Sequence, residues 1–94
     1  MITVVVTIKP KPGREHEFEK SFHDYAGTVR ANEPGTILYT LNRSRDDAAV
    51  YQAIEIYADD AAMQTHLQNF EAAGVGDDTL FVSPPKFRIL DRLV

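Results

Sequence analysis

Hydrophobic and polar residues follow two periodic patterns along the first half of the chain, one typical of strands and one typical of helices. Residues 2–8, "ITVVVTI", are rich in β-branched side chains, and the prolines and glycine of "KPKPG" end the run. From residue 14 to about residue 30, apolar side chains recur at the spacing of one helical face, at Phe18, Phe22, Tyr25 and Val29. The pattern predicts a strand followed by a helix with one buried face.

The second half repeats this order with one extra strand. Residues 36–43 and about 49–57 alternate as strands, and the charged segment "RSRDD" between them predicts a hairpin. Asp59 is a candidate N-cap for a helix with a buried stripe of Met63, Leu67 and Phe70. The segment 72–78 ends that helix, residues 79–83 fit either a helical turn or a loop, and "SPPK" leads into a strand reaching about residue 93.

This order, β-α-β-β-α-β, predicts an α+β protein of the ferredoxin-like class, with one domain over residues 1–94. Its four-stranded antiparallel sheet carries both helices on one face. Yet the strands are apolar on both sides: Val5 opposes Val4 and Val6, and Ile54 opposes Ala53. A sheet with a free face normally alternates to polar residues there. We therefore expect that face to meet the sheet of an identical chain in a homodimer.

The junction "ANEPGT" joins the first helix to the second strand. Asn32 suits a left-handed helix end, and Glu33, which precedes Pro34, is pushed out of the helical region. Pro34 and Gly35 suit the centre of a type II turn, with Gly35 at positive φ. Because polar residues at such junctions usually serve caps and turns, we interpret Glu33 as structural rather than catalytic.

Composition narrows the possible functions. The 94 residues include no cysteine, which excludes disulfides, thiolate nucleophiles and iron–sulfur clusters and gives no reason to expect an oxidising compartment. We expect a cytoplasmic protein. The net charge of −4 is spread along the chain, so a nucleic-acid partner is not expected. No stretch approaches the roughly 20 apolar residues of a membrane span, so none is expected to insert in a membrane.

The segments "EPGTILY" (33–39) and "EIYADDAAMQTH" (55–66) resemble the antibiotic biosynthesis monooxygenase (ABM) domain, the YgiN-like or LsrG-like group of dimeric α+β barrels. The likeness covers nearly the whole chain: a helix start after Gly13, the "EPG" turn, Glu55 inside the third strand and His66 in the next helix fall in order. The resemblance implies two protomers that pair their sheets, each with an apolar pocket between sheet and helices.

The resemblance also implies a range of activities. Some members oxygenate phenols, anthrones or quinols without metal or flavin, whereas others isomerise small phosphorylated carbonyl compounds or degrade haem. This chain has Tyr57 where several oxygenases carry Trp, and Glu71 and Ala72 where many members carry a His-Phe pair. We expect a monooxygenase that needs no cofactor and acts with O2 on a small phenolic, quinol or polyketide-like substrate.

Two alternatives stay open. A carbonyl isomerase would need basic groups such as Lys9, Arg43 or Arg45 as anion anchors inside the pocket. The other alternative is a dimeric domain without catalysis, which binds a ligand or serves as a scaffold, and a scaffold would show a filled core with no cavity near His66.

Five residues are candidates for the site. His66 lies at the edge of the predicted stripe among small neighbours, and it is either a satisfied buried histidine or the catalytic proton acceptor. Glu55 either fixes helix to sheet or holds the imidazole of His66 as a catalytic partner. Tyr51, Tyr57 and Asn69 are the candidate substrate-binding residues, with a core role as the alternative for the tyrosines.

His16, Glu19 and His23 suggest a metal site, because they recur on one face of the first helix. That face points away from the Phe18–Phe22 stripe and toward water, where no further ligands are expected. No metal site is therefore predicted.

Overall fold

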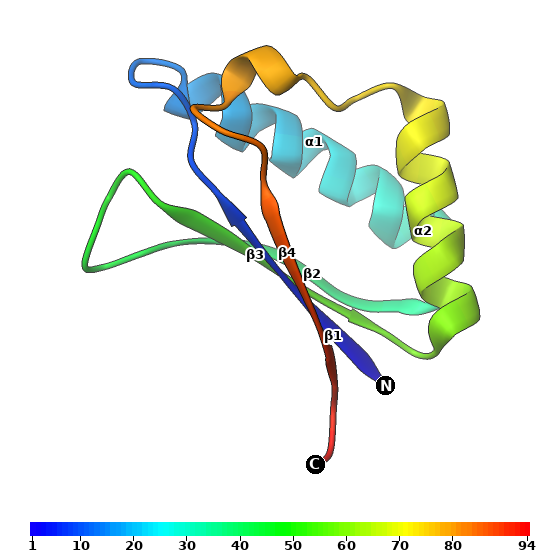
Figure 1. The fold of residues 1–94 in the computed structure, drawn as a ribbon. Coiled ribbons are helices and arrows are strands. Elements are labelled where there is room, and N and C mark those ends of the chain that lie inside the picture. Colours follow the sequence, from blue (N-terminus) through cyan, green and yellow to red (C-terminus); the bar gives the residue numbers. More distant parts are fainter.

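The computed structural model describes all 94 residues as one four-stranded sheet with two helices on one of its faces (Figure 1). The elements are β1 (Ile2–Ile8), α1 (Glu15–Asn32), β2 (Thr36–Arg43), β3 (Tyr51–Tyr57), α2 (Asp60–Ala73), a 3-10 turn η1 (Asp78–Leu80) and β4 (Lys86–Asp91). Every strand pairing is antiparallel, and the strand order is β2-β3-β1-β4. The predicted β-α-β-β-α-β fold is confirmed.

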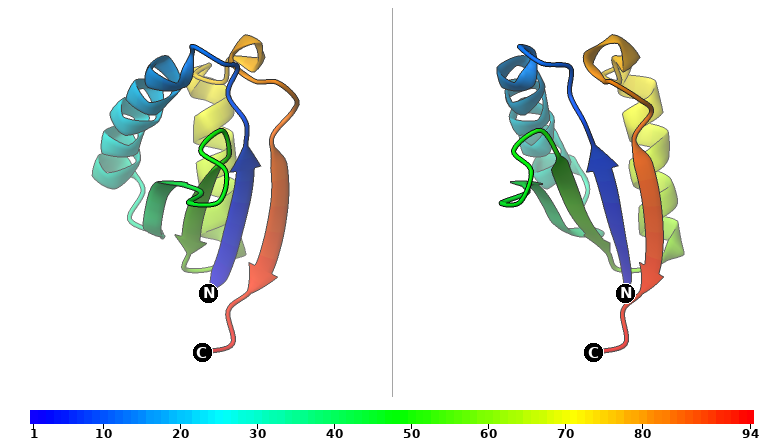
Figure 2. Two further views of the ribbon diagram at one scale, coloured as in Figure 1. Left: turned by 90° about the vertical axis from the view of Figure 1, so that its left-hand side faces the viewer. Right: turned by 60° about the vertical axis from the view of Figure 1, so that its left-hand side comes forward.

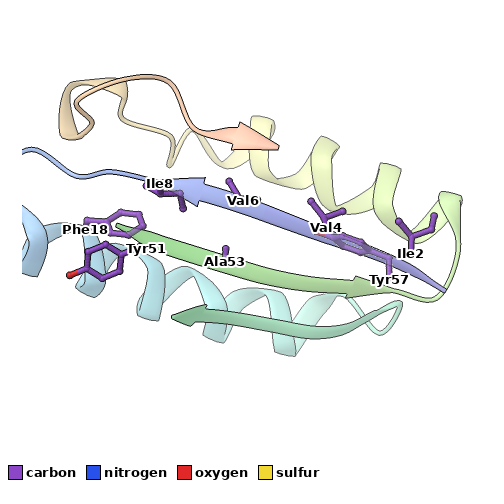
Figure 3. Packing of buried hydrophobic residues seen from close by; sticks show 8 residues of the cluster. All are labelled: Ile2, Val4, Val6, Ile8, Phe18, Tyr51, Ala53 and Tyr57. Atoms are coloured by element: carbon purple, nitrogen blue, oxygen red, sulfur yellow. The ribbon is translucent and has the colours of Figure 1, made fainter. Parts of the chain in front are cut away.

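The core lies between the sheet and α1. Alternate residues of β1 and β3 are buried, as the period of two along a strand requires. Figure 3 shows these side chains on one face of the sheet, with Phe18 of α1 packed against them. They are Ile2, Val4, Val6, Ile8, Tyr51, Ala53 and Tyr57. Glu55 occupies the same face and pairs in register with Val4, so its carboxylate enters the space between sheet and helices.

The two helices differ in how they use their apolar faces. In α1, Phe18 and Val29 of the predicted stripe are buried, Phe22 and Tyr25 are half-buried, and Ala26, outside the predicted stripe, is buried as well. In α2 the only buried residue is His66, while Leu67 is 46% exposed. The predicted buried stripe of α2 is therefore wrong. The reason is that α2 makes its main contacts with β2 and β3, while its middle turns border a cavity rather than the core.

The ends of α2 follow the sequence signals. The side chain of Asp59 accepts a hydrogen bond from the backbone N–H of Ala62 at 2.8 Å, and Gly74 ends the helix in the left-handed conformation. The chain then runs back over the start of α1 before it enters β4 (Figures 1 and 2). The N–H of Lys11 holds this segment by donating to the carbonyl of Leu80 at 2.7 Å. None of the helices is long and apolar enough to cross a membrane.

The turn after α1 differs from the prediction. Asn32 remains helical, and the residues with positive φ are Gly13 and Gly74, so Gly35 does not form a type II turn. The turn is closed by the N–H of Thr36, which donates to the carbonyl of Glu33 at 3.1 Å. Glycine is required here for a different reason: a Cβ on Gly35 would lie 2.6 Å from the Cβ of Ala62. Helix α2 therefore sits directly on this turn.

Gly35→Ala is expected to destabilise the protein, because the added methyl group would overlap Ala62 and push α2 away from the turn. Overpacking of this kind costs about 1–3 kcal/mol, which thermal unfolding followed by circular dichroism would detect. Gly27→Ala is the matched control, since a Cβ there meets nothing within 4 Å and alanine is the better helix former. A Gly35→Ala protein as stable as Gly27→Ala would show that this close approach does not constrain the fold.

Candidate active site

His66 is brought to the sheet by the contact between α2 and the turn. Ala62 and His66 are one helical turn apart on the same face of α2. Because Ala62 packs closely against Gly35, this face points toward the sheet, and the imidazole of His66 points the same way. The His66 side chain is 5% exposed. Its ring lies among aromatic rings, with centroid distances of 5.0 Å to Tyr39 and 5.5 Å to Tyr57.

Glu33 is the residue that holds this imidazole. Its Oε1 lies 2.8 Å from Nδ1 of His66, and both side chains are buried. The same carboxylate accepts hydrogen bonds from the Thr36 hydroxyl at 3.0 Å and from the Asn69 amide at 3.4 Å. Because a carboxylate only accepts, the contact favours the tautomer with its proton on Nδ1. The Glu33 carboxylate therefore does more than the structural role interpreted from the sequence.

Glu55 has a different place from the one expected. Its Oε1 lies 4.0 Å from Nε2 of His66, which is too long for a hydrogen bond, and it accepts one from the Tyr57 hydroxyl. The expectation that Glu55 holds the imidazole is therefore wrong. Burial raises the pKa of Glu55 above its usual range, while the Tyr57 hydrogen bond and His66 oppose this shift.

The second nitrogen of His66 is open to a cavity. Nε2 makes no hydrogen bond within the protein. Every side-chain nitrogen or oxygen that is fully buried has a hydrogen-bond partner. The atom must therefore be accessible, and His66 lines a cavity of about 270 Å³ between the sheet, both helices and the η1 segment. With Nδ1 held by Glu33, the lone pair of Nε2 is available to a bound molecule.

The cavity is mainly apolar and carries negative charge. Of its 20 lining residues 13 are hydrophobic, and the charged side chains among them are Glu55, Asp77 and Asp78. No lysine or arginine lines it. Ligand pockets of about 300–1,000 Å³ hold drug-sized molecules, so this cavity suits one small and largely apolar molecule.

A more open groove of about 640 Å³ runs between α1 and β2 and includes the exposed His16 and His23. It contains neither His66 nor Glu55. No group of three or more His, Cys, Asp or Glu side chains is placed to hold a metal ion.

The residues predicted for the site are only partly together. His66 and Glu55 line the cavity, but Tyr51, Tyr57 and Asn69 do not. Tyr51 points its hydroxyl to Glu19 at 2.6 Å, and the hydroxyl of Tyr57 and the amide of Asn69 are used to hold Glu55 and Glu33.

The tyrosines of the lining are Tyr25 and Tyr39, which the sequence reasoning missed as site residues. Two features of the sequence could have indicated them. Tyr25 belongs to the apolar stripe of α1, and Tyr39 is the last residue of the "EPGTILY" segment.

Comparison with known proteins places the chain in a family. The antibiotic biosynthesis monooxygenase domain matches residues 1–74. A Caulobacter crescentus protein provisionally named an antibiotic biosynthesis monooxygenase is 39% identical, with a TM-score of 0.89 over 99% of this chain and 90% of its own. A Pseudomonas aeruginosa protein is 28% identical, with a TM-score of 0.82 over 99% of this chain and 94% of its own. The chain therefore belongs to the antibiotic biosynthesis monooxygenase family.

The same fold occurs in more distant proteins. A Mycobacterium tuberculosis protein is 22% identical, with a TM-score of 0.79 over 99% of this chain and 95% of its own. No curated protein sequence matches the chain significantly.

Glu55→Gln is expected to stabilise the protein at neutral pH and to lose this advantage in acid. The pKa of Glu55 in the folded protein lies above its ordinary value of 4.5, so the free energy of unfolding falls as pH rises from the unfolded to the folded pKa. Above that interval wild type keeps a charged buried carboxylate, whereas glutamine is neutral and can still accept from Tyr57. Melting temperatures measured from below about pH 4 to neutral pH test this, and a less stable variant at neutral pH would contradict it.

Proposed function

We propose that this protein is a cofactor-independent monooxygenase that uses O2 to oxidise a small phenolic or quinol substrate in the cavity beneath α2. One observation carries the proposal: His66 is buried, its Nδ1 is held by Glu33 at 2.8 Å, and the residue lines a mainly apolar cavity. A neutral imidazole held in this way can accept a hydroxyl proton at neutral pH. Membership of the family supports the reaction class.

The chemistry needs little from the protein beyond proton transfer and orientation. When His66 takes the hydroxyl proton of a phenol, Glu33 stabilises the resulting imidazolium and the substrate becomes an electron-rich phenolate. A phenol with an unsubstituted para carbon can then react with O2 to give a quinone and water. One oxygen atom becomes the new carbonyl, and the other leaves as water with the hydroxyl and ring hydrogens, so four electrons pass from substrate to O2.

The cavity lining favours this reaction over the alternatives. An isomerase acting on phosphorylated compounds would use lysine or arginine to hold the phosphate, whereas the charged groups here are carboxylates. Lys9, Arg43 and Arg45, the expected anchors, are absent from the lining. A non-catalytic scaffold with a filled core would leave no space beside His66, whereas a cavity lies there.

A homodimer closed through the uncovered sheet face is the second part of the proposal. On that face Val5, Ile54 and Ile56 are half-buried, and Leu38 is 39% exposed. Ile54 pairs directly with Val5, and Ile56 with Leu38, so these side chains form one continuous apolar surface. Such a surface on a small protein typically marks an interaction site.

His66→Ala and His66→Gln should both lower the rate of oxygen consumption by at least about 100-fold, because loss of a general base typically costs 10²- to 10⁴-fold. Glutamine can still donate to Glu33, so it keeps that carboxylate satisfied if the alanine variant folds poorly. The assay is an oxygen electrode with anthrones and hydroquinones, without added metal or flavin. His23→Gln, exposed on α1, is the control. Turnover at the wild-type rate in the folded variants, or equal turnover without oxygen, would refute the assignment.

Sedimentation velocity should show wild type as a dimer at micromolar concentration and Ile54→Glu as a folded monomer, because a carboxylate in the centre of the apolar face would be desolvated in the interface. Gln64→Glu, an exposed position on α2, adds the same charge elsewhere and should leave the dimer intact. A wild-type monomer would contradict the proposed interface.

A further inference from the structure

The hydroxyl of Tyr39 has no hydrogen-bond partner in the protein, although most of the residue is buried. The residue is 6% exposed, yet its hydroxyl makes no hydrogen bond, whereas those of Tyr51 and Tyr57 bond to Glu19 and Glu55. Every fully buried side-chain oxygen has a hydrogen-bond partner. The Tyr39 hydroxyl has none, so it must be accessible from a cavity or groove that Tyr39 lines. Tyr39 lines both the cavity and the groove along α1, so its neighbours decide which of the two the hydroxyl meets.

The Tyr39 ring lies against His66, which lines the cavity and not the groove. The Tyr39 ring stacks on Phe22 at 4.9 Å with an interplanar angle of 10°, and its centroid is 5.0 Å from that of His66. Burial raises the pKa of Tyr39 far above its usual range, and the nearby carboxylates of Glu55 and Glu33 raise it further. The hydroxyl therefore stays protonated at neutral pH and can donate a hydrogen bond.

The cavity needs such a donor. A substrate that gives its proton to His66 leaves a negative oxygen close to Glu55, whose carboxylate can only repel it when ionised. No lysine or arginine lines the cavity to balance that charge. Tyr25 is the other tyrosine of the lining, but it is half-buried and its ring lies farther from His66, at 6.4 Å. Tyr39 is thus the hydroxyl donor best placed to meet the oxygen.

We propose that Tyr39 is a substrate-binding and catalytic residue, whose hydroxyl donates a hydrogen bond to the substrate oxygen that loses its proton to His66. The chemical role rests on the proposed function, while the contact rests on the geometry of Tyr39. The O–H proton of the substrate moves to Nε2, the imidazolium pairs with Glu33, and the new oxyanion accepts from Tyr39. Preorganised donors of this kind stabilise charge that develops during reaction.

The test uses 4-nitrophenol, whose phenolate form absorbs visible light and can be titrated while bound. Tyr39→Phe keeps the ring and its stacking on Phe22 but removes the donor. We expect the variant to bind the phenolate at least about tenfold more weakly than wild type does, as loss of a hydrogen bond to a charged group implies. Nitrobenzene, which has no hydroxyl, should bind both proteins equally. The melting temperature should be unchanged or higher, because the lost hydroxyl has no partner in the protein.

Tyr51→Phe is the matched control, since it removes a hydroxyl that bonds Glu19 outside the cavity, and it should bind the probe as wild type does. Equal phenolate binding by Tyr39→Phe and wild type, or no phenolate binding by wild type, would overturn the proposal. The measurement involves neither oxygen nor turnover. A selective loss in Tyr39→Phe would therefore support the contact even if no phenol were oxidised, and that outcome would refute the oxygenase alone.

Discussion

The buried hydrogen bond between Glu33 and His66 is the contact on which the site depends. It joins the turn after α1 to the middle of α2, two segments far apart in sequence, at 2.8 Å. A buried carboxylate is costly unless its oxygens accept hydrogen bonds. Besides His66, the donors to Glu33 are Thr36, at the start of β2, and Asn69, in α2. The bond therefore fixes the direction of the helix and the tautomer of the imidazole together.

The cavity follows from the way α2 is held. Ala62 packs on Gly35, and the helix makes its main contacts with β2 and β3, so its later turns leave a cavity over the sheet. Leu67 and Phe70, which a fully packed helix would bury, instead line a cavity and stay partly exposed. Helix α2 therefore buries less apolar surface than a fully packed helix would, and the resulting cavity lies beside His66.

Local pattern was enough to predict most of the fold, because strand alternation, the α1 stripe and the Asp59 cap each depend on neighbouring residues. The site depends on contacts between distant segments. Gly35 is required by the approach of Ala62 rather than by its own φ, and nothing near Glu33 shows that its side chain meets His66. Strand alternation places Tyr39, Tyr51 and Tyr57 on the same face of the sheet. Which of them lines the cavity depends on where α2 lies over the strands, and Tyr39 is the one that does.

The central claim is that Glu33 holds His66 with its proton on Nδ1 and its lone pair on Nε2 facing the cavity. Nitrogen-15 NMR of the histidine rings distinguishes protonated from unprotonated ring nitrogens directly, and His66→Gln identifies the His66 signals by their loss. At neutral pH the account predicts a protonated Nδ1 and an unprotonated Nε2 for His66. A proton on Nε2 with a bare Nδ1 would contradict the account, because the imidazole could then not accept a proton from a molecule in the cavity.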